Sequence, residues 1–244
     1  MKVINFGYVI ERTVLSDSRL IRLTVRSATL AKEEGSDVSW KTLTYFGDSM
    51  LLLPTAMILA LMIWFKSSNS YTAWDWLITF GLAGLIVSLS KIAFLGFGIG
   101  SAQFNFTGFS GHSTMSATLW PVMFWLLSHP IARQRWRGAM ISIGYLIPLA
   151  VGVSRLVLHY HSPSEVIAGL ALGYALSSRF LIVQRHTRLD GFSLRQLGAA
   201  LAIPLILIGH GRIATTQQFL TQLSLHIAGI EHPWTRERLL RQGN

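Results

Sequence analysis

Three separated stretches of this chain hold side chains that can bind and transfer a phosphoryl group, and each lies at the end of a long apolar segment. Imidazole attacks phosphorus or moves a proton, and lysine and arginine bind phosphate oxygens. The residues concerned are Lys91, Ser110, Gly111, His112, Ser154, Arg155, His161 and Glu165. Their combination predicts phosphoryl transfer through a covalent phosphohistidine. No metal-ligand spacing accompanies them, so we expect no metal and no other cofactor.

The third stretch has the most specific spacing. Glu165 follows His161 by four residues, close enough to hydrogen-bond one ring nitrogen and leave the other free as a nucleophile. The same residues, Ser162 to Glu165, also form a capping box at a helix start, which requires no catalysis. Arg155 favours the catalytic interpretation, because a guanidinium at the end of an apolar span is costly to leave unpaired and suits phosphate binding. An interfacial arginine that reaches lipid headgroups is the structural alternative.

The second stretch predicts an anion site at a helix start. Gly111 allows a tight turn, the free amides of the first helical turn attract an anion, and Ser110 adds a hydroxyl donor. His112 would protonate the leaving alkoxide and then activate water. A simple Ser-Gly helix entry is the structural alternative.

The first stretch consists of Lys91, which lies inside an apolar run. An amine in such a run either extends to the membrane interface or binds an anion, and we interpret Lys91 as a phosphate-binding residue.

Composition indicates which elements must position these residues. Of the 244 residues, 51% are hydrophobic and 13% charged, whereas a soluble domain has roughly a quarter charged. The bilayer is therefore the expected solvent. The absence of cysteine excludes disulfides and thiolate chemistry. The net charge of +10 is carried mainly by arginines between apolar spans, which indicates membrane topology and anionic lipid contact rather than nucleic-acid binding.

We expect an all-α integral membrane bundle of about six transmembrane helices, with five as the fallback because the last stretch is short. The apolar stretches are Ser49 to Phe65, Trp74 to Phe97, Ser113 to Leu127, Gly138 to Leu158, Glu165 to Val183 and Leu197 to Ile208. Residues 1–47 are expected to form an amphipathic interfacial segment without a cleavable signal peptide, residues 48–212 the transmembrane domain and residues 213–244 a C-terminal tail.

The arginines predict the orientation. Two connectors are rich in arginine and face the cytoplasm by the positive-inside rule. Their arginines are Arg133, Arg135 and Arg137 in one connector and Arg185, Arg188 and Arg195 in the other. The connectors Gly98 to Gly111 and His159 to Ser164 then face outward. We therefore expect a multi-pass protein of the cell (inner) membrane with its active site on the external, periplasmic side.

In these residues and their spacing, the chain resembles the type 2 phosphatidic acid phosphatase family, which shares its core with vanadium haloperoxidases. The family pattern is K-x6-R-P, P-S-G-H and S-R-x5-H-x3-D, and the resemblance covers about Leu51 to Val183. The resemblance implies that His161 is the nucleophile, Glu165 its orienting carboxylate and His112 the acid-base residue. It implies phosphate binding by Lys91, Ser110, Gly111 and Arg155.

The chain departs from the family pattern in its first motif above all. Gly98 stands where the family has arginine, and Ile99 where it has proline. Phe109 replaces the proline of the second motif, and Glu165 replaces an aspartate while keeping its charge. One preorganised donor contributes about 3 kcal/mol to transition-state stabilisation, so loss of the arginine predicts activity about two orders of magnitude lower unless another group substitutes. Nearby candidates are Gln103, Asn105 and His159.

The expected function is hydrolysis of a lipid phosphomonoester or pyrophosphate in the membrane. Phosphatidic acid, phosphatidylglycerol phosphate and isoprenyl pyrophosphates all fit the residues, and no oligomeric state is indicated. Two alternatives stay open. One is a lipid phosphotransferase that uses the same site with a second lipid headgroup as acceptor. The other is a catalytically weakened member that binds lipids or acts as a scaffold, which the glycine at position 98 suggests.

Overall fold

The computed structural model describes residues 39–187, 189, 195, 198 and 216–242. The chain divides into two compact units, Met1–Thr42 and Leu43–Asn244. Most of the expected amphipathic segment 1–47 lies outside the described residues. The expected sixth span, Leu197 to Ile208, also lies outside them apart from Gly198.

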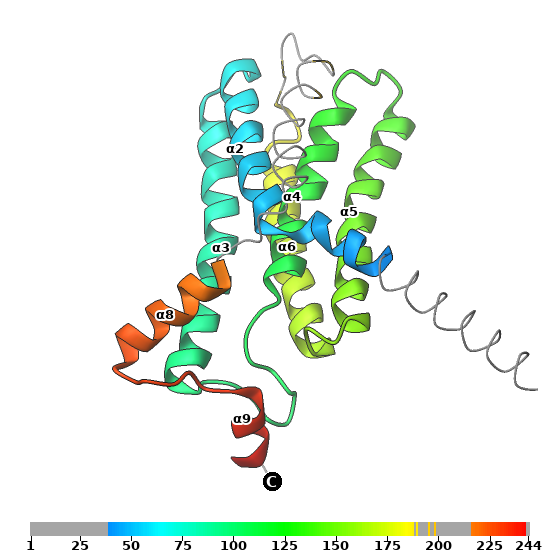
Figure 1. Cartoon of the computed structure of the whole chain (residues 1–244). Helices are drawn as coiled ribbons and strands as arrows, with labels where there is room; N and C mark the ends of the chain where they lie inside the picture. The colour runs from blue at the N-terminus through cyan, green and yellow to red at the C-terminus, as the bar shows by residue number, and fades with distance from the viewer. Residues whose placement is uncertain (1–38, 188, 190–194, 196–197, 199–215, 243–244) are drawn as a thin grey trace, which may run out of the picture. The chain divides into compact units, whose positions relative to one another are not determined.

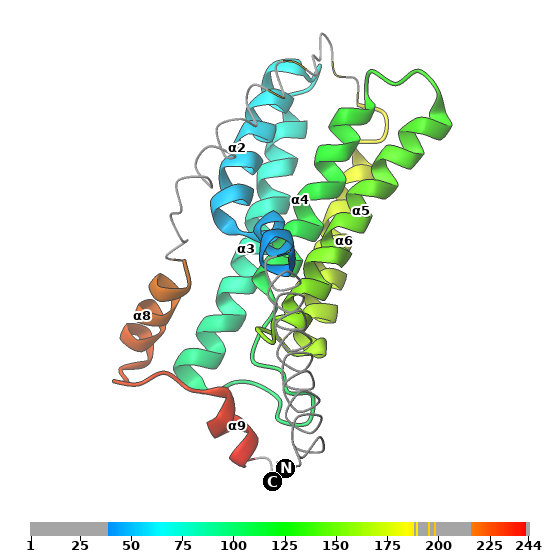
Figure 2. The same cartoon turned by 45° about the vertical axis from the view of Figure 1, so that its right-hand side comes forward.

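The described part of the second unit is helical, and its helices α2 to α6 lie alongside one another in both views (Figures 1 and 2). The elements are η1 (Tyr45–Gly47), α2 (Ser49–Lys66), α3 (Tyr71–Phe97), α4 (Gly111–Ser128), α5 (Gln134–Val157), α6 (Pro163–Val183), α8 (Thr216–Ala228) and α9 (Arg236–Gln242). Five of the expected apolar stretches are thus confirmed as helices, with ends that differ by a few residues. The all-α fold is also confirmed.

Four helical segments among the described residues are long and apolar enough to cross a membrane. They are Ser39–Lys66, which contains α2, and Tyr71–Phe97, Gln134–Val157 and Pro163–Val183. At 1.5 Å per residue, the 27 residues of α3 extend about 40 Å, which exceeds the hydrocarbon thickness of about 30 Å. The expected span Ser113 to Leu127 forms α4, which lies outside this group because serine and threonine lower its hydropathy.

Helix α4 forms the buried centre of the bundle, between α5 and α6 on one side and α2 and α3 on the other. Its buried hydroxyls are satisfied inside the helix: Thr114 Oγ1 donates to the Ser110 carbonyl at 3.0 Å, and Thr118 Oγ1 donates to the Thr114 carbonyl at 2.9 Å. These bonds remove the cost of burying polar groups. A central helix surrounded by other helices therefore does not need the uniformly apolar surface of a lipid-facing span.

Glycines on α6 allow it to pack very closely against α4. A Cβ at Gly173 would lie 2.4 Å from the Thr114 carbonyl oxygen and 2.6 Å from the Ala117 Cβ. A Cβ at Gly169 would lie 2.9 Å from Thr114 Oγ1. Because Gly169 meets the first turn of α4 and Gly173 the next, the two helices run in the same direction. Their N-termini therefore lie at the same end of the bundle.

An aromatic cluster fixes the opposite end. Phe180 of α6 packs edge-on against Trp76 of α3 at 5.7 Å and against Trp125 of α4 at 5.8 Å between ring centroids. Trp76 Nε1 donates to the Ala56 carbonyl of α2 at 2.9 Å. All three rings are buried. The cluster joins four helices far from the phosphate-handling residues and so sets the positions of the helix ends that carry them.

Candidate active site

The three stretches converge because α3 and α5 end where α4 and α6 begin. Lys91 lies near the end of α3, His112 in the first turn of α4 and Arg155 in the last turn of α5, and His161 directly precedes α6. All four line one cavity of about 340 Å³. The antiparallel succession of helices thus brings residues from distant parts of the sequence to one end of the bundle.

The pair formed by His161 and Glu165 is the best-defined part of the site. His161 Nδ1 lies 2.7 Å from Glu165 Oε2, and the carboxylate is completely buried. Ser162 N also donates to Glu165 Oε2 at 3.2 Å, and Ser162 Oγ accepts from Glu165 N at 3.4 Å. The capping box and the histidine contact therefore exist together. Within the described residues His161 Nε2 has no hydrogen-bond partner, so it is the nitrogen available for attack.

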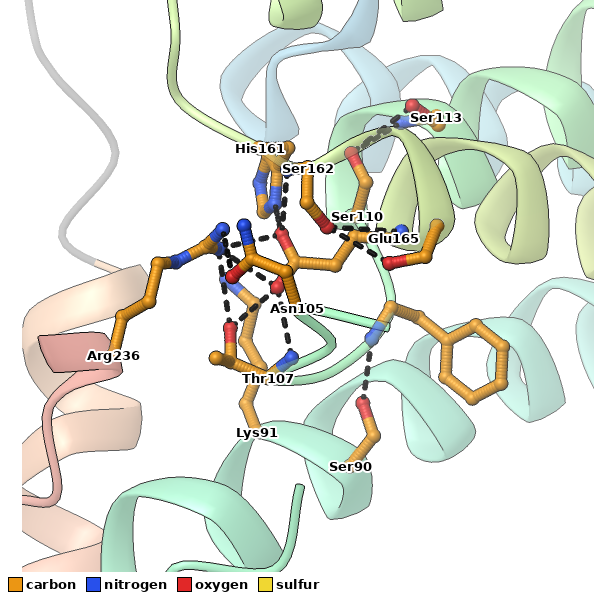
Figure 3. Close-up of polar contacts among 12 residues, drawn as sticks. Ser90, Lys91, Asn105, Thr107, Ser110, Ser113, His161, Ser162, Glu165 and Arg236 are labelled. Carbon is orange, nitrogen blue, oxygen red and sulfur yellow. Dashed lines mark hydrogen bonds and ion pairs between the residues drawn. The ribbon is translucent and has the colours of Figure 1, made fainter. Parts of the chain in front are cut away.

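The loop between α3 and α4 holds the same carboxylate from a second side (Figure 3). Thr107 donates to Glu165 Oε1 through its backbone N–H, at 2.8 Å, and through its hydroxyl. The loop is itself anchored on the start of α6, because Ser164 Oγ donates to the Phe104 carbonyl at 2.7 Å. No pattern in the sequence marks Thr107 as a site residue, since it is an isolated threonine in a loop.

Arg236 of α9 completes the surroundings of Glu165. Its Nη2 lies 2.8 Å from both carboxylate oxygens, and its Nη1 donates to Asn105 Oδ1 at 3.1 Å. Figure 3 shows the side chain reaching from α9 toward Glu165, with Asn105 and Thr107 beside it. Arg236 lies 71 positions after Glu165 in the sequence, and no motif links them. For that reason the sequence indicated only a C-terminal tail in this segment.

Arg155 lines the cavity and also has a buried donor without a partner among the described residues. Its guanidinium lies 4.4 Å from the Tyr160 ring centroid, and Nη1 donates to Thr44 Oγ1 at 2.8 Å. Its buried Nε has no hydrogen-bond partner among the described residues. Leaving a buried donor unsatisfied costs about 1 to 3 kcal/mol, and more for a charged group.

Two further contacts fix the remaining cavity residues. Lys91 Nζ donates to Gln217 Oε1 of α8 at 2.6 Å. His112 Nε2 lies 3.9 Å from Asp48 Oδ2, beyond hydrogen-bond distance, and the two form an ion pair only when His112 is protonated. Gln217 and Asp48 are also residues that the sequence patterns did not reveal.

Ser110 and Gly111 lie apart from the cavity that holds the two histidines. Ser110 is fully buried, and its Oγ accepts from Ser113 N at 3.5 Å and from Ser113 Oγ at 3.0 Å. The hydroxyl thus caps α4. Gly111 lines an adjoining cavity. Their positions match those of a Ser-Gly helix entry, and the expected hydroxyl donation to phosphate would require the fully buried Ser110 side chain to reach the cavity.

Burial and neighbouring cations control the protonation of the two histidines, which lie at the mouth of the bundle. Burial lowers the pKa of His112 to about 3, and repulsion from Arg155, His161 and Lys91 acts in the same direction. Burial also lowers the pKa of His161 below 6.5, although the hydrogen bond and the charge of Glu165 oppose this change. Both imidazoles are therefore uncharged near neutral pH, which is the form that a nitrogen nucleophile requires.

A second cavity, of about 350 Å³, adjoins the first, since Lys91, His112 and Gln217 line both. It lies among α2, α3, α4 and α8. Its apolar lining consists of Leu52, Leu53, Val87, Met115 and Leu220. A cationic cavity and an apolar cavity thus share one boundary.

Gly98, where the family pattern has arginine, ends α3 in the left-handed conformation with φ of 69°. The space beside it is filled by Trp234, because a Cβ at Gly98 would lie 2.6 Å from the indole ring. Among the substitutes suggested by the sequence, Asn105 accepts a hydrogen bond from Arg236, and neither Gln103 nor His159 lines the cavity.

A family model described as the PAP2 superfamily matches residues 72–190, which include all of these motifs. The chain belongs to the PAP2 superfamily. This PAP2 protein is 40% identical over 208 residues to an uncharacterized 22.5 kDa protein in the cps region of Klebsiella pneumoniae, a match that covers 84% of this chain and 99% of the other. The resemblance stated from the sequence is thereby confirmed.

Two relatives of this PAP2 protein have names that state an activity. Phosphatidylglycerophosphatase B of Bacillus subtilis (strain 168) is 25% identical over 162 residues, or 62% of this chain and 76% of the relative. Glucose-6-phosphatase 3 of Homo sapiens is 44% identical over 71 residues, or 28% of this chain and 20% of the relative. This chain is therefore a multi-pass membrane protein of a phosphatase family.

Proposed function

We propose that this PAP2 protein hydrolyses a lipid phosphomonoester or pyrophosphate through a phosphohistidine at His161. The observation that supports a lipid substrate is the shared boundary of the two cavities. The phosphate group would lie among Lys91, Arg155 and the two histidines, and the apolar tail among the leucines of α2 and α8. A phosphorylated lipid matches this division between charge and hydrocarbon.

In the proposed reaction, His161 Nε2 attacks phosphorus while the bond from phosphorus to the leaving oxygen breaks. His112 gives its proton to that oxygen, and Glu165 accepts the hydrogen bond from His161 Nδ1 as the ring acquires positive charge. A water molecule then attacks phosphorus, His112 takes its proton, and the bond between phosphorus and nitrogen breaks. Lys91 and Arg155 stabilise the negative charge on the phosphoryl oxygens in both steps.

Substrate binding would supply the proton-donating form of His112. With cations around it, the pKa of His112 is about 3. A phosphate dianion brings two negative charges next to the imidazole, and an opposite charge within a few ångströms favours the protonated ring. His112 would therefore take up a proton together with the phosphate, and it would be charged when the leaving oxygen needs a proton.

The test uses the purified full chain in detergent with short-chain phosphatidic acid, phosphatidylglycerol phosphate, an isoprenyl pyrophosphate and glucose 6-phosphate. We expect phosphate release from a lipid substrate, loss of at least about 10³-fold in His161→Ala, and an acid-labile, base-stable phosphoprotein in the wild type. His159→Asn is the matched control, because His159 lies two residues away, outside the cavity, and asparagine tolerates its φ of 55°.

Equal phosphate release from wild type and His161→Ala would remove His161 from the mechanism. Faster hydrolysis of glucose 6-phosphate than of the lipid phosphates would mean that the substrate is a soluble sugar phosphate and not a lipid. Transfer of phosphate to an added lipid headgroup, with little free phosphate, would identify a phosphotransferase instead. The proposed chemistry assigns every step to side chains, so EDTA is expected to leave the rate unchanged, and loss of activity in EDTA would contradict this part of the proposal.

We further propose that the site faces the external, periplasmic side of the cell membrane. At the opposite end of the bundle, where α3 and α5 begin and α6 ends, basic residues predominate among those described. They are Lys66, Arg133, Arg135, Arg137, Arg179 and Arg185. The positive-inside rule assigns this end to the cytoplasm.

A further inference from the structure

Arg236 is the cation that contacts Glu165 of the catalytic pair, and the family motifs do not account for it. Its guanidinium bonds both oxygens of Glu165, and the same cavity is lined by Arg236 and His161. The carboxylate is completely buried, whereas the side chain of Arg236 is 34% exposed. The carboxylate of Glu165 therefore interacts with the His161 imidazole on one side and with the permanently charged guanidinium of Arg236 on the other.

Packing around Gly98 places α9 where this contact forms. Trp234 N donates to the Leu95 carbonyl at 2.9 Å, and the Trp234 ring lies directly beside Gly98. Arg238 lies 3.8 Å from the centroid of the same ring, and Leu239 is buried. A side chain at position 98 would collide with the indole. The glycine that replaces the expected arginine is therefore also the residue that allows the C-terminal segment to dock.

We propose that Arg236 is a positioning residue of the phosphatase site, which acts through Glu165 to keep His161 uncharged and correctly oriented for attack. This inference rests on the proposed role of His161 as nucleophile. A guanidinium is thus restored to the site by the C-terminal segment in place of the one missing at position 98. The segment 216–242 is then part of the enzyme's active site rather than a tail.

The physical reason lies in the competition for the carboxylate. A buried carboxylate 2.7 Å from an imidazole stabilises the imidazolium, which has no lone pair for attack. Burial is the main cause that lowers the pKa of His161 below 6.5, and Lys91 and Arg155 act in the same direction. Arg236 bonds both oxygens of Glu165 and balances part of its negative charge, which weakens the attraction of the carboxylate for a protonated imidazole. When His161 Nε2 bonds to phosphorus and the ring becomes positive, the carboxylate is already aligned with Nδ1. Arg236 also restricts rotation of Glu165, since it holds both oxygens.

Several other charged or titratable groups face His161, and all of them stay constant in the experiment. They are Lys91 from α3, His112 from α4, Arg155 and Tyr160 at the end of α5, and Glu165 from α6. Lys91 and Arg155 also disfavour a charged His161, and this repulsion persists when Arg236 is replaced. Removal of Arg236 therefore produces a partial shift in the protonation of His161.

The experiment measures the dependence of kcat/KM on pH for wild type, Arg236→Gln, Arg236→Lys and the control Arg241→Gln, which changes a basic residue of the same helix. For Arg236→Gln we expect the acid limb to move up by about one pH unit, with a loss that approaches tenfold at pH values well below the wild-type limb and mostly recovers by pH 8.5. Arg236→Lys keeps the charge and should return the limb toward its wild-type position. Arg241→Gln should match the wild type.

An equal loss at every pH with the limb unmoved would mean that Arg236 only supports the fold, and unchanged activity in Arg236→Gln would mean that it has no role. Either result overturns the inference. The proposed function is judged separately, by His161→Ala in a protein with Arg236 intact. If that variant is inactive and the limb of Arg236→Gln is unmoved, only the role of Arg236 fails.

Discussion

Replacement of Glu165 by glutamine tests the catalytic pair while keeping the shape of the side chain. Oε2 accepts from His161 Nδ1 at 2.7 Å and from Ser162 N at 3.2 Å, and Oε1 accepts twice from Thr107. Whichever way the glutamine amide turns, its NH2 group faces two donors. Arg236 loses an ionic partner in either orientation. The substitution therefore breaks at least two contacts.

Hydrogen bonds to a charged group contribute about 1.5 to 3 kcal/mol each, so two lost contacts amount to about 3 to 6 kcal/mol. If most of this loss is expressed in the transition state, kcat falls by about 10² to 10⁴-fold, since 1.36 kcal/mol corresponds to a factor of ten. We expect KM to change little, because Lys91 and Arg155 still bind the phosphate. Comparable losses follow when an amide replaces the orienting carboxylate of a Ser-His-Asp triad, about 10⁴-fold.

The assay is phosphate release from a short-chain lipid phosphate in detergent at saturating substrate, with thermal unfolding measured on the same samples. Asp75→Asn is the matched control, because Asp75 is a carboxylate paired with Arg179 at the other end of the bundle. That variant should retain the wild-type kcat. A folded Glu165→Gln protein with kcat within tenfold of the wild type would refute the reasoning, since the carboxylate would then have no role in orienting His161.

Two further predictions concern packing and orientation. Gly173→Ala places a Cβ 2.4 Å from the Thr114 carbonyl oxygen, so we expect a loss of about 1 to 3 kcal/mol in stability and a lower unfolding temperature in detergent. Gly138→Ala, whose Cβ meets nothing within 4 Å, should not lose stability, and similar behaviour of the two variants would contradict the close packing of α4 and α6. The chain has no cysteine, which allows the orientation to be tested with single cysteines. A maleimide that cannot cross the membrane should label Phe104→Cys in intact cells but Arg135→Cys only after permeabilisation; the reverse pattern would place the site in the cytoplasm.

The sequence predicted α2 to α6 well because each consists of a continuous apolar stretch, whereas α8 and α9 lie in a segment that was expected to be a tail. The start of α6 is marked by a local signal that the sequence revealed, the Ser162 to Glu165 box, and the start of α2 is capped by Asp48, which was not recognised from the sequence. Helix α4 shows the limit of such reasoning. Its apolar stretch was recognised, but its threonines and serines did not indicate that it is the central helix, because their burial depends on the helices that surround it.

Site residues were predictable where they follow one another at a fixed spacing. Glu165 follows His161 by four positions, and the cap at Ser162 turns the chain into α6 between them, so the contact follows from local geometry. Thr107, Gln217 and Asp48 have no such spacing. Each contacts a site residue through a fold that joins distant segments, and none of these residue types is unusual in a loop or at a helix end.

The sequence by itself determined that the protein lies in a lipid bilayer, which stretches form its long apolar helices, and which side chains are available for phosphoryl transfer. It could do so because hydropathy, capping and motif spacing are local properties. Only the tertiary structure decided that Arg236, rather than a residue near Gly98, contacts Glu165, and that Lys91 contacts Gln217 of α8. The physical reason is that charge pairing and close packing depend on distance in space. Docking of Trp234 beside a glycine brings together residues that no local pattern connects.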